Sequence, residues 1–277
     1  SASSAIEEYA VWGGVPRYWE LRLQEESLND ALLQHLFSPL GILIEEPLRL
    51  FVDDIRDSAQ SYTILSLIGN GVHRLSEIAA RLEKPATQLS RPLEKLLQLG
   101  YIQRVLPFGE LEKNSKKGIY QIADPFVHFY FSFVVPNRSL IELDKGAAVL
   151  QQLRPALGIY MAAWWEKLCR QAVSGADVEG QSFGMARSWW GNVSKTERLE
   201  LDVVAESLDG KSLLVGECKW TEQEQASRLL FELEEKVKKW PLAQDKTIIP
   251  CLFLKHSPKD KVASKVFLPD EVLELLK

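Results

Sequence analysis

The sequence predicts a multi-domain α/β protein, and three observations lead to that fold class. At 277 residues the chain is long enough for two or three domains with apolar cores. Apolar residues at helical spacing dominate the N-terminal half, with Gly and Pro between the helices. After residue 125, a long helix precedes several strand-like runs and one amphipathic helix, which is typical of a mixed sheet. We expect domains at residues 1–52, 53–124 and 125–277.

Composition and charge narrow the function classes without choosing one. The apolar and charged fractions, 46% and 26%, are ordinary for a globular protein. No apolar run reaches membrane-spanning length, so we expect a cytoplasmic protein without a membrane partner. The net charge of −5 gives no global sign of nucleic-acid binding, so local basic clusters must carry that argument. Because the chain does not start with Met, we expect a fragment of a longer protein.

The three cysteines, Cys169, Cys218 and Cys251, are widely spaced and form no C-x-x-C pair. This pattern favours a reducing compartment and argues against a thiolate zinc site.

Residues 1–52 predict a small helical cap. Helices are expected at residues 6–12, 18–29, 29–37 and 42–54. Gly13-Gly14-Val15-Pro16 cannot continue a helix, so a tight turn is expected between the first two.

Residues 53–124 predict three helices followed by two strands. The helices are expected at residues 55–68, around 76–82 and at 85–99, and the strands at 101–106 and 118–122. This order is typical of a winged helix-turn-helix, in which the third helix enters the major groove of DNA and the wing contacts the backbone. The candidate DNA-binding residues are Thr87, Gln88, Ser90, Arg91 and Lys95 on the third helix, and Lys113, Lys116 and Lys117 in the wing. A winged helix that docks a protein remains the alternative.

A predicted hairpin organises residues 125–277. Strand-like runs at 199–206 and 212–220 flank Asp209-Gly210, a strong hairpin signal because a two-residue primed turn needs positive φ. Such a loop pairs Leu208 with Lys211 and places Asp202 opposite Glu217. Side chains alternate along a strand. One face should therefore carry Glu200, Asp202, Glu217 and Lys219, and the other, facing a core, Leu201, Val203, Leu214 and Cys218.

Opposed carboxylates at Asp202 and Glu217 need an explanation, because like charges directly across a sheet are unfavourable. Mg²⁺ or Mn²⁺ supplies one, since hard cations bind carboxylate oxygens. Lys219 would then position a phosphate or a water beside the metal. The alternative is a solvated face with unrelated charges, and a three-residue loop would change the register.

The acid at Asp202, followed on the next strand by Glu217-Cys218-Lys219, resembles the PD-(D/E)XK nuclease-like superfamily, with Leu201 where the motif name has Pro. The resemblance implies a restriction-endonuclease-like αβββαβ domain. It also implies a Glu on the helix before the sheet, for which Glu166 is the candidate and a solvated helix charge the alternative. The implied catalytic residues are Asp202, Glu217, Lys219 and Glu166, with Asp202 and Glu217 as metal ligands.

Two further segments resemble archaeal-type ATPases of the STAND/AAA-like group. Tyr9-x-x-x-Gly13-Gly14-x-Pro16-x-Tyr18 is similar to the segment that closes their nucleotide-binding module. The I-A-D-P-F-x-x-F-x-x-x-F run that starts at Ile122 is similar to the junction after their winged helix. The resemblance implies that the chain is the C-terminal portion of such a protein, with an upstream ATPase module or another protein as its partner.

These expectations lead to two main functional hypotheses. The first is a magnesium-dependent DNA nuclease with a winged-helix DNA-binding domain. The second is a non-catalytic DNA- or protein-interaction module that regulates an upstream ATPase; a structural tail is a third option. Trp189-Trp190 is expected on or beside the first strand, packed in a core rather than stacked on bases.

Overall fold

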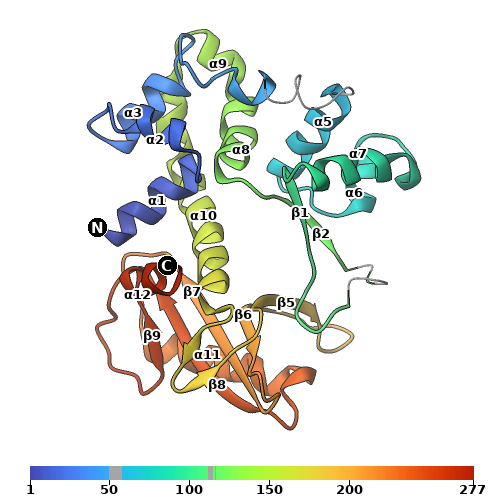
Figure 1. Cartoon of the computed structure of the whole chain (residues 1–277), viewed down its shortest axis with the longest axis vertical. Coiled ribbons are helices and arrows are strands. Elements are labelled where there is room, and N and C mark those ends of the chain that lie inside the picture. The colour runs from blue at the N-terminus through green and yellow to red at the C-terminus, as the bar shows by residue number, and fades with distance from the viewer. Residues whose placement is uncertain (50–57, 112–114, 116) are drawn as a thin grey trace. The chain divides into compact units, whose positions relative to one another are not determined.

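The computed structural model describes residues 1–49, 58–111, 115 and 117–277 of a mixed α/β chain. The chain divides into two compact units. The helical unit contains Glu7–Val105 and Gly118–Leu157, and the sheet unit contains Ser1–Ile6, Leu106–Lys117 and Gly158–Lys277. Figure 1 shows short helices throughout the helical unit and one larger sheet with helices in the sheet unit.

The helical unit consists of short helices and one two-stranded sheet. Its helices are α1 (Ala2–Trp12, of which the first residues belong to the sheet unit), α2 (Pro16–Arg22), α3 (Leu28–His35), α5 (Ser58–Gly69), α6 (Leu75–Arg81), α7 (Ala86–Gln98), α8 (Pro125–Phe129), α9 (Arg138–Glu142) and the first part of α10 (Gly146–Val173). The strands β1 (Ile102–Val105) and β2 (Ile119–Ile122) pair antiparallel. The predicted helix at 85–99 and the two predicted strands are confirmed with slightly shorter ends.

The helices expected near the N-terminus need correction. The predicted helix at 18–29 is two helices, because α2 ends at Arg22 and Ser27 caps α3. The Ser27 hydroxyl accepts a hydrogen bond from the Asp30 amide at 3.2 Å. This amide lies in the first turn of α3 and has no backbone acceptor within the helix, so the side chain takes that place. Of the helices predicted at 42–54 and 55–68, residues 50–57 lie outside the described residues.

The segment that contains Gly13 and Tyr18 packs against the segment Asp124-Pro125-Phe126 in the helical unit. Gly13 has a φ of +63°, and a Cβ built there would lie 3.1 Å from Asp124 Oδ2 and 3.2 Å from Pro125 Cδ. The rings of Tyr18 and Phe126 are 4.1 Å apart. Gly13 is therefore needed both for its backbone conformation and for the close approach of Asp124-Pro125.

The sheet unit is built on a five-stranded sheet in the order β5-β6-β7-β8-β9. Its strands are β5 (Arg187–Asn192), β6 (Arg198–Glu206), β7 (Ser212–Lys219), β8 (Thr247–Leu254) and β9 (Lys265–Phe267), with a small hairpin of β3 (Asp177–Val178) and β4 (Gln181–Ser182). Its helices are the rest of α10, α11 (Ala226–Lys239) and α12 (Pro269–Leu275). Strands β5 to β7 are antiparallel, whereas β8 runs parallel to β7, as the helical crossover predicts. The sequence reasoning did not predict β3, β4, β9 or α12.

Helices cover both faces of this sheet beside β7. Val215 belongs to an apolar cluster with Leu233 and Val237 of α11. On the opposite face, the Cys218 thiol forms a hydrogen bond with the Cys169 thiol of α10. Both faces of β7 are therefore buried, and a polar side chain in it needs partners.

Trp189 and Trp190 lie on β5 and are buried, so the expected core packing is confirmed. The Trp189 ring meets the ring of Trp240 edge-on at 5.8 Å.

Candidate functional site

The register of the β6–β7 hairpin is the predicted one. Val203 pairs with Gly216 and Val204 with Val215. The predicted two-residue primed turn is wrong, because Gly210, at φ +71°, donates a backbone hydrogen bond to Ser207 O at 2.9 Å and residues 208–211 form a longer loop. This loop is also even in length and centred on the same point, so the pairing of the strands is unchanged.

A β-bulge lies in β6 at Asp202. Between the pairs Arg187↔Val204 and Trp189↔Leu201, β5 advances two residues and β6 advances three, so the extra residue is in β6. Next to it, the backbone N–H of Cys218 donates to Asp202 Oδ2 at 2.8 Å. The Asp202 carboxylate thus takes a backbone donor of the neighbouring strand and is fixed beside Glu217.

The bulge corrects the prediction that four polar side chains share one face. Leu201 packs in the cluster with Val204 and Val215 on the α11 side, rather than on the side of Cys218. Since neighbouring side chains alternate, Glu200 points to the other side, and its charge acts on Glu166 of α10. The extra residue in β6 reverses the alternation that a regular hairpin would keep.

Glu217 is buried, with an exposed fraction of 7%, and an ammonium group is bound to each of its oxygens. Lys219 Nζ donates to Oε1 at 2.8 Å, and Lys236 Nζ, from α11, donates to Oε2 at 2.6 Å. Burial, the largest single effect, lowers the pKa of Lys219. The hydrogen bond to Glu217 and the nearby negative charges, first that of Glu217, together outweigh it, so the pKa is raised.

Arg170 joins α10 to β6 on the other side of the site. Its Nη1 donates to the backbone oxygen of Asp202 at 2.8 Å and lies 3.6 Å from Glu166 Oε2. Glu166 therefore faces the Asp202 region.

Asp202 and Glu166 are poorly stabilised as anions. Burial, followed by the charge of Glu217, raises the pKa of Asp202 to about 6. Burial, followed by the charge of Asp202, raises the pKa of Glu166 to about 7. A cation between such groups would relieve both effects, and perturbed carboxylates of this kind are common at functional sites.

Within the described part of the chain, no group of three or more His, Cys, Asp or Glu side chains is arranged to hold a metal ion. Mg²⁺, however, is usually held by one or two protein carboxylates, with waters and substrate phosphates completing its shell. The carboxylate oxygens of Asp202 and Glu217, with Glu166 nearby, are donors of the kind that fits Mg²⁺ or Mn²⁺.

Lys236 and Arg170 were not predicted as residues of the site, although the helical spacing of each was visible in the sequence. Lys236 lies seven residues after Leu229 and three after Leu233, on the buried side of α11. Arg170 lies four residues after Glu166, the spacing of helix ion pairs.

The structure exposes all five candidate DNA-binding residues of α7, namely Thr87, Gln88, Ser90, Arg91 and Lys95. Of the wing residues, Lys113 and Lys116 lie outside the described residues. Lys117 is exposed and pairs with Glu110 at 2.5 Å. Its segment belongs to the sheet unit, where the Phe108 amide donates to Ser188 O of β5 at 2.8 Å. The residues between β1 and the expected wing loop are therefore anchored to β5.

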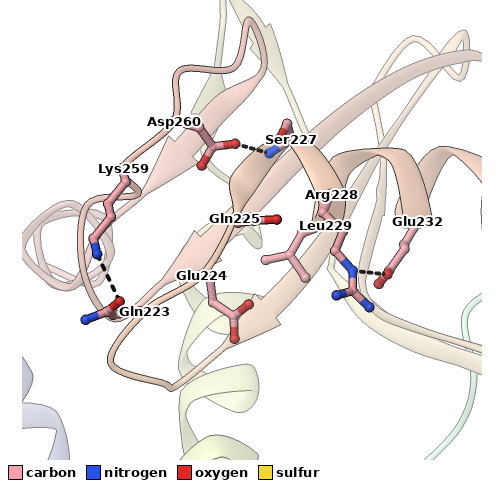
Figure 2. A pocket seen from close by; sticks show the side chains of 9 residues that line it. All are labelled: Gln223, Glu224, Gln225, Ser227, Arg228, Leu229, Glu232, Lys259 and Asp260. Carbon is pink, nitrogen blue, oxygen red and sulfur yellow. Dashed lines mark hydrogen bonds and ion pairs between the residues drawn. The ribbon is translucent and has the colours of Figure 1, made fainter.

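A groove of about 700 Å³ lies at the first turns of α11 (Figure 2). Asp260 caps this helix by accepting from the amides of Ala226 at 2.9 Å and Ser227 at 2.7 Å. Hydrogen bonds from the hydroxyl and the amide of Ser227 lower the pKa of Asp260 to about 2. Figure 2 shows that Arg228 is turned towards Glu232, with which it pairs at 2.8 Å. Asp260 and Ser227, and likewise Arg228 and Glu232, are thus engaged with each other.

Residues 130–230, which include Glu166, Asp202, Glu217 and Lys219, match the family DUF234, described as archaeal and bacterial proteins of unknown function. A protein of Methanocaldococcus jannaschii described as uncharacterized is 26% identical over 219 residues, which are 78% of this chain and 47% of that protein. The crystal structure of protein VC1899 from Vibrio cholerae is similar over 87% of this chain and 54% of its own, with 14% identity and a TM-score of 0.31. The chain spans about half the length of these proteins.

None of the helices in the described ranges has the length and apolar character needed to cross a membrane.

Proposed function

We propose that the sheet unit is a magnesium-dependent DNA nuclease of the PD-(D/E)XK type. The observation that carries the proposal is the bulge that fixes Asp202 beside Glu217 in the register required by the acid and acid-x-Lys motif. Burial of the Glu217 carboxylate, and the raised pKa of Asp202, support a cation as their natural partner.

Each residue of the site has a role in phosphodiester hydrolysis. Asp202 and Glu217 would hold the cation, which would polarise the phosphodiester and lower the pKa of the attacking water. Lys219 positions the phosphate or the attacking water. Glu166, whose pKa is near 7, accepts the proton of that water. The water oxygen forms a new bond to phosphorus and the bond to the leaving oxygen breaks. The leaving oxygen takes up a proton from the solvent, to which Glu166 releases the proton that it accepted.

Cleavage of plasmid and single-stranded DNA in Mg²⁺ or Mn²⁺ tests the proposal. We expect Asp202→Ala and Lys219→Ala each to lower the cleavage rate by about 10²–10³-fold, because the first removes a ligand of the cation and the second removes the charge that positions the phosphate or the water. Glu197→Gln, an exposed change in the loop before β6, serves as the control and should retain the wild-type rate within about twofold. Equal cleavage by all four proteins would rule out this site.

The second candidate is a non-catalytic interaction module for an upstream ATPase. Its support is the charge balance at Glu217, where two ammonium groups already neutralise the carboxylate. It predicts nucleic-acid or protein binding with no cleavage in any divalent cation.

We propose further that the helical unit carries a winged-helix DNA interface on α7, since its five candidate side chains are exposed together. The double variant Arg91→Glu/Lys95→Glu should weaken duplex binding and reduce the slope of log K against log[salt] by about 2, because two phosphate contacts are lost. Fluorescence anisotropy over a range of salt concentrations measures both quantities.

Arg17→Glu is the control, because Arg17 is an exposed arginine on α2 of the same unit. If the α7 double variant and this control bind DNA equally well, α7 does not contact DNA, and the protein-docking alternative is favoured.

A further inference from the structure

Lys236 adds a second cation to the site, from an element that the nuclease motif does not include. It lies on α11, and its Nζ is 2.6 Å from Glu217 Oε2. Lys219, on β7, is bound to the other oxygen at 2.8 Å. Both lysine side chains have exposed fractions of 34%, whereas that of the Glu217 side chain is 10%, so each ammonium group joins a buried carboxylate to the solvent.

The two ammonium groups occupy the atoms that a metal ion would use. Mg²⁺ binds carboxylate oxygens at about 2.0–2.1 Å and requires a nearly ideal octahedral geometry. An ammonium group hydrogen-bonded to Glu217 Oε2 competes with such an ion for the same oxygen. A lysine can give way, because its charge is carried on a flexible four-carbon chain.

The binding of a cation would disturb the charge balance of this cluster. The single carboxylate of Glu217 already binds two ammonium groups, those of Lys219 and Lys236. A divalent cation adds two positive charges to this partly buried cluster, and uncompensated charge in such a place is costly. An anion that binds beside the cation would restore the balance.

We propose that Lys236 is a positioning residue that holds Glu217 in the metal-free protein and binds a phosphate oxygen of the substrate once a cation occupies the carboxylates. This inference rests on the proposed nuclease function and extends it. Its consequence is that the cation and a phosphodiester bind cooperatively, each increasing the affinity of the other by the same factor.

Calorimetric titration with Mn²⁺, with and without excess dimethyl phosphate, tests the proposal on the wild type and on Lys236→Gln and Lys236→Met. Without the phosphodiester, both variants should bind Mn²⁺ about 3–10-fold more tightly than the wild type, because a competing charge is removed. Dimethyl phosphate should tighten Mn²⁺ binding to the wild type and have little effect on the variants. DNA cleavage by the variants should fall about 10–100-fold.

Lys238→Gln is the matched control, because Lys238 lies on the same helix and pairs with Glu235 at the surface. Weaker Mn²⁺ binding by both Lys236 variants, or a phosphodiester effect as large as in the wild type, would overturn the role of Lys236. If the wild type binds no Mn²⁺ and cleaves no DNA, the proposed function itself fails. If it does both and the Lys236 variants behave like Lys238→Gln, only the present inference fails.

Discussion

At about pH 8 and without metal, Asp202→Asn should be more stable than the wild type, by about 1–3 kcal/mol in the free energy of unfolding. The reason is that the folded protein raises the pKa of Asp202 to about 6, mainly through burial and then through Glu217. Ionised Asp202 is therefore unfavourable in the fold. The neutral amide removes that cost, and its oxygen still accepts the Cys218 N–H.

The sign of the pH dependence is set by the same shift. Because the folded pKa lies above the unfolded value, the folded wild type binds more protons between about pH 4 and pH 6, and its stability falls as pH rises through that window. The advantage of the variant should therefore be absent near pH 4 and fully developed above about pH 7. Mn²⁺ should stabilise the wild type at high pH and leave Asp202→Asn unchanged.

Urea unfolding followed by tryptophan fluorescence measures the free energy of unfolding of the sheet unit, in which Asp202 lies. Trp164, Trp165, Trp189, Trp190, Trp220 and Trp240, six of the eight tryptophans, lie in the sheet unit. Glu197→Gln, exposed just before the same strand, is the control and should change stability by less than about 1 kcal/mol. Equal destabilisation by Asp202→Asn at low and high pH would mean that the carboxylate is a structural acceptor without electrostatic strain.

The relative position of Asp202 and Glu217 could be predicted from the sequence, because the register of a hairpin depends only on the centre and the length of its loop. The Asp209-Gly210 signal fixes the centre of the loop, and any even loop with that centre gives the same pairing. The loop conformation itself was not predictable, since Ser207, Asp209 and Ser212 satisfy one another through side-chain hydrogen bonds that favour a longer turn.

The bulge and the second lysine could not be read from the same pattern. The extra residue in β6 is defined by the pairing of β6 with β5. The sequence of the hairpin loop between β6 and β7 carries no information on that pairing. The spacing of Lys236 from Leu229 and Leu233 places it on the buried side of α11. The sequence does not show, however, against which strand that side packs. The chemistry of the site thus depends partly on local sequence and partly on the packing of α11 on β7.

Glu217→Gln should have the opposite effect to Asp202→Asn and lower stability by about 2–3 kcal/mol at about pH 8, because removing one partner of a buried ion pair leaves the other charges uncompensated. Glu217 is buried and accepts from Lys219 and Lys236, whereas Asp202 gains no comparable ion pair. The cost is placed below the usual range for fully buried pairs since both lysines reach the solvent. The measurement is again urea unfolding followed by tryptophan fluorescence.

A double-mutant cycle with Lys236→Met separates the charge effect from a packing effect. If uncompensated charge is the cause, Lys236→Met should recover part of the stability lost in Glu217→Gln, because the number of unpaired ammonium groups falls. Glu197→Gln is the matched control: Glu197 pairs with Lys239 of the same helix at the same 2.6 Å, but at the surface, so its loss should cost less than about 1 kcal/mol. Equal effects of the two Glu→Gln changes would show that burial gives Glu217 no special electrostatic role. A large loss at Glu217 beside a gain at Asp202 would show that two neighbouring carboxylates are held in opposite electrostatic states, one already compensated by lysines and the other still in need of a cation.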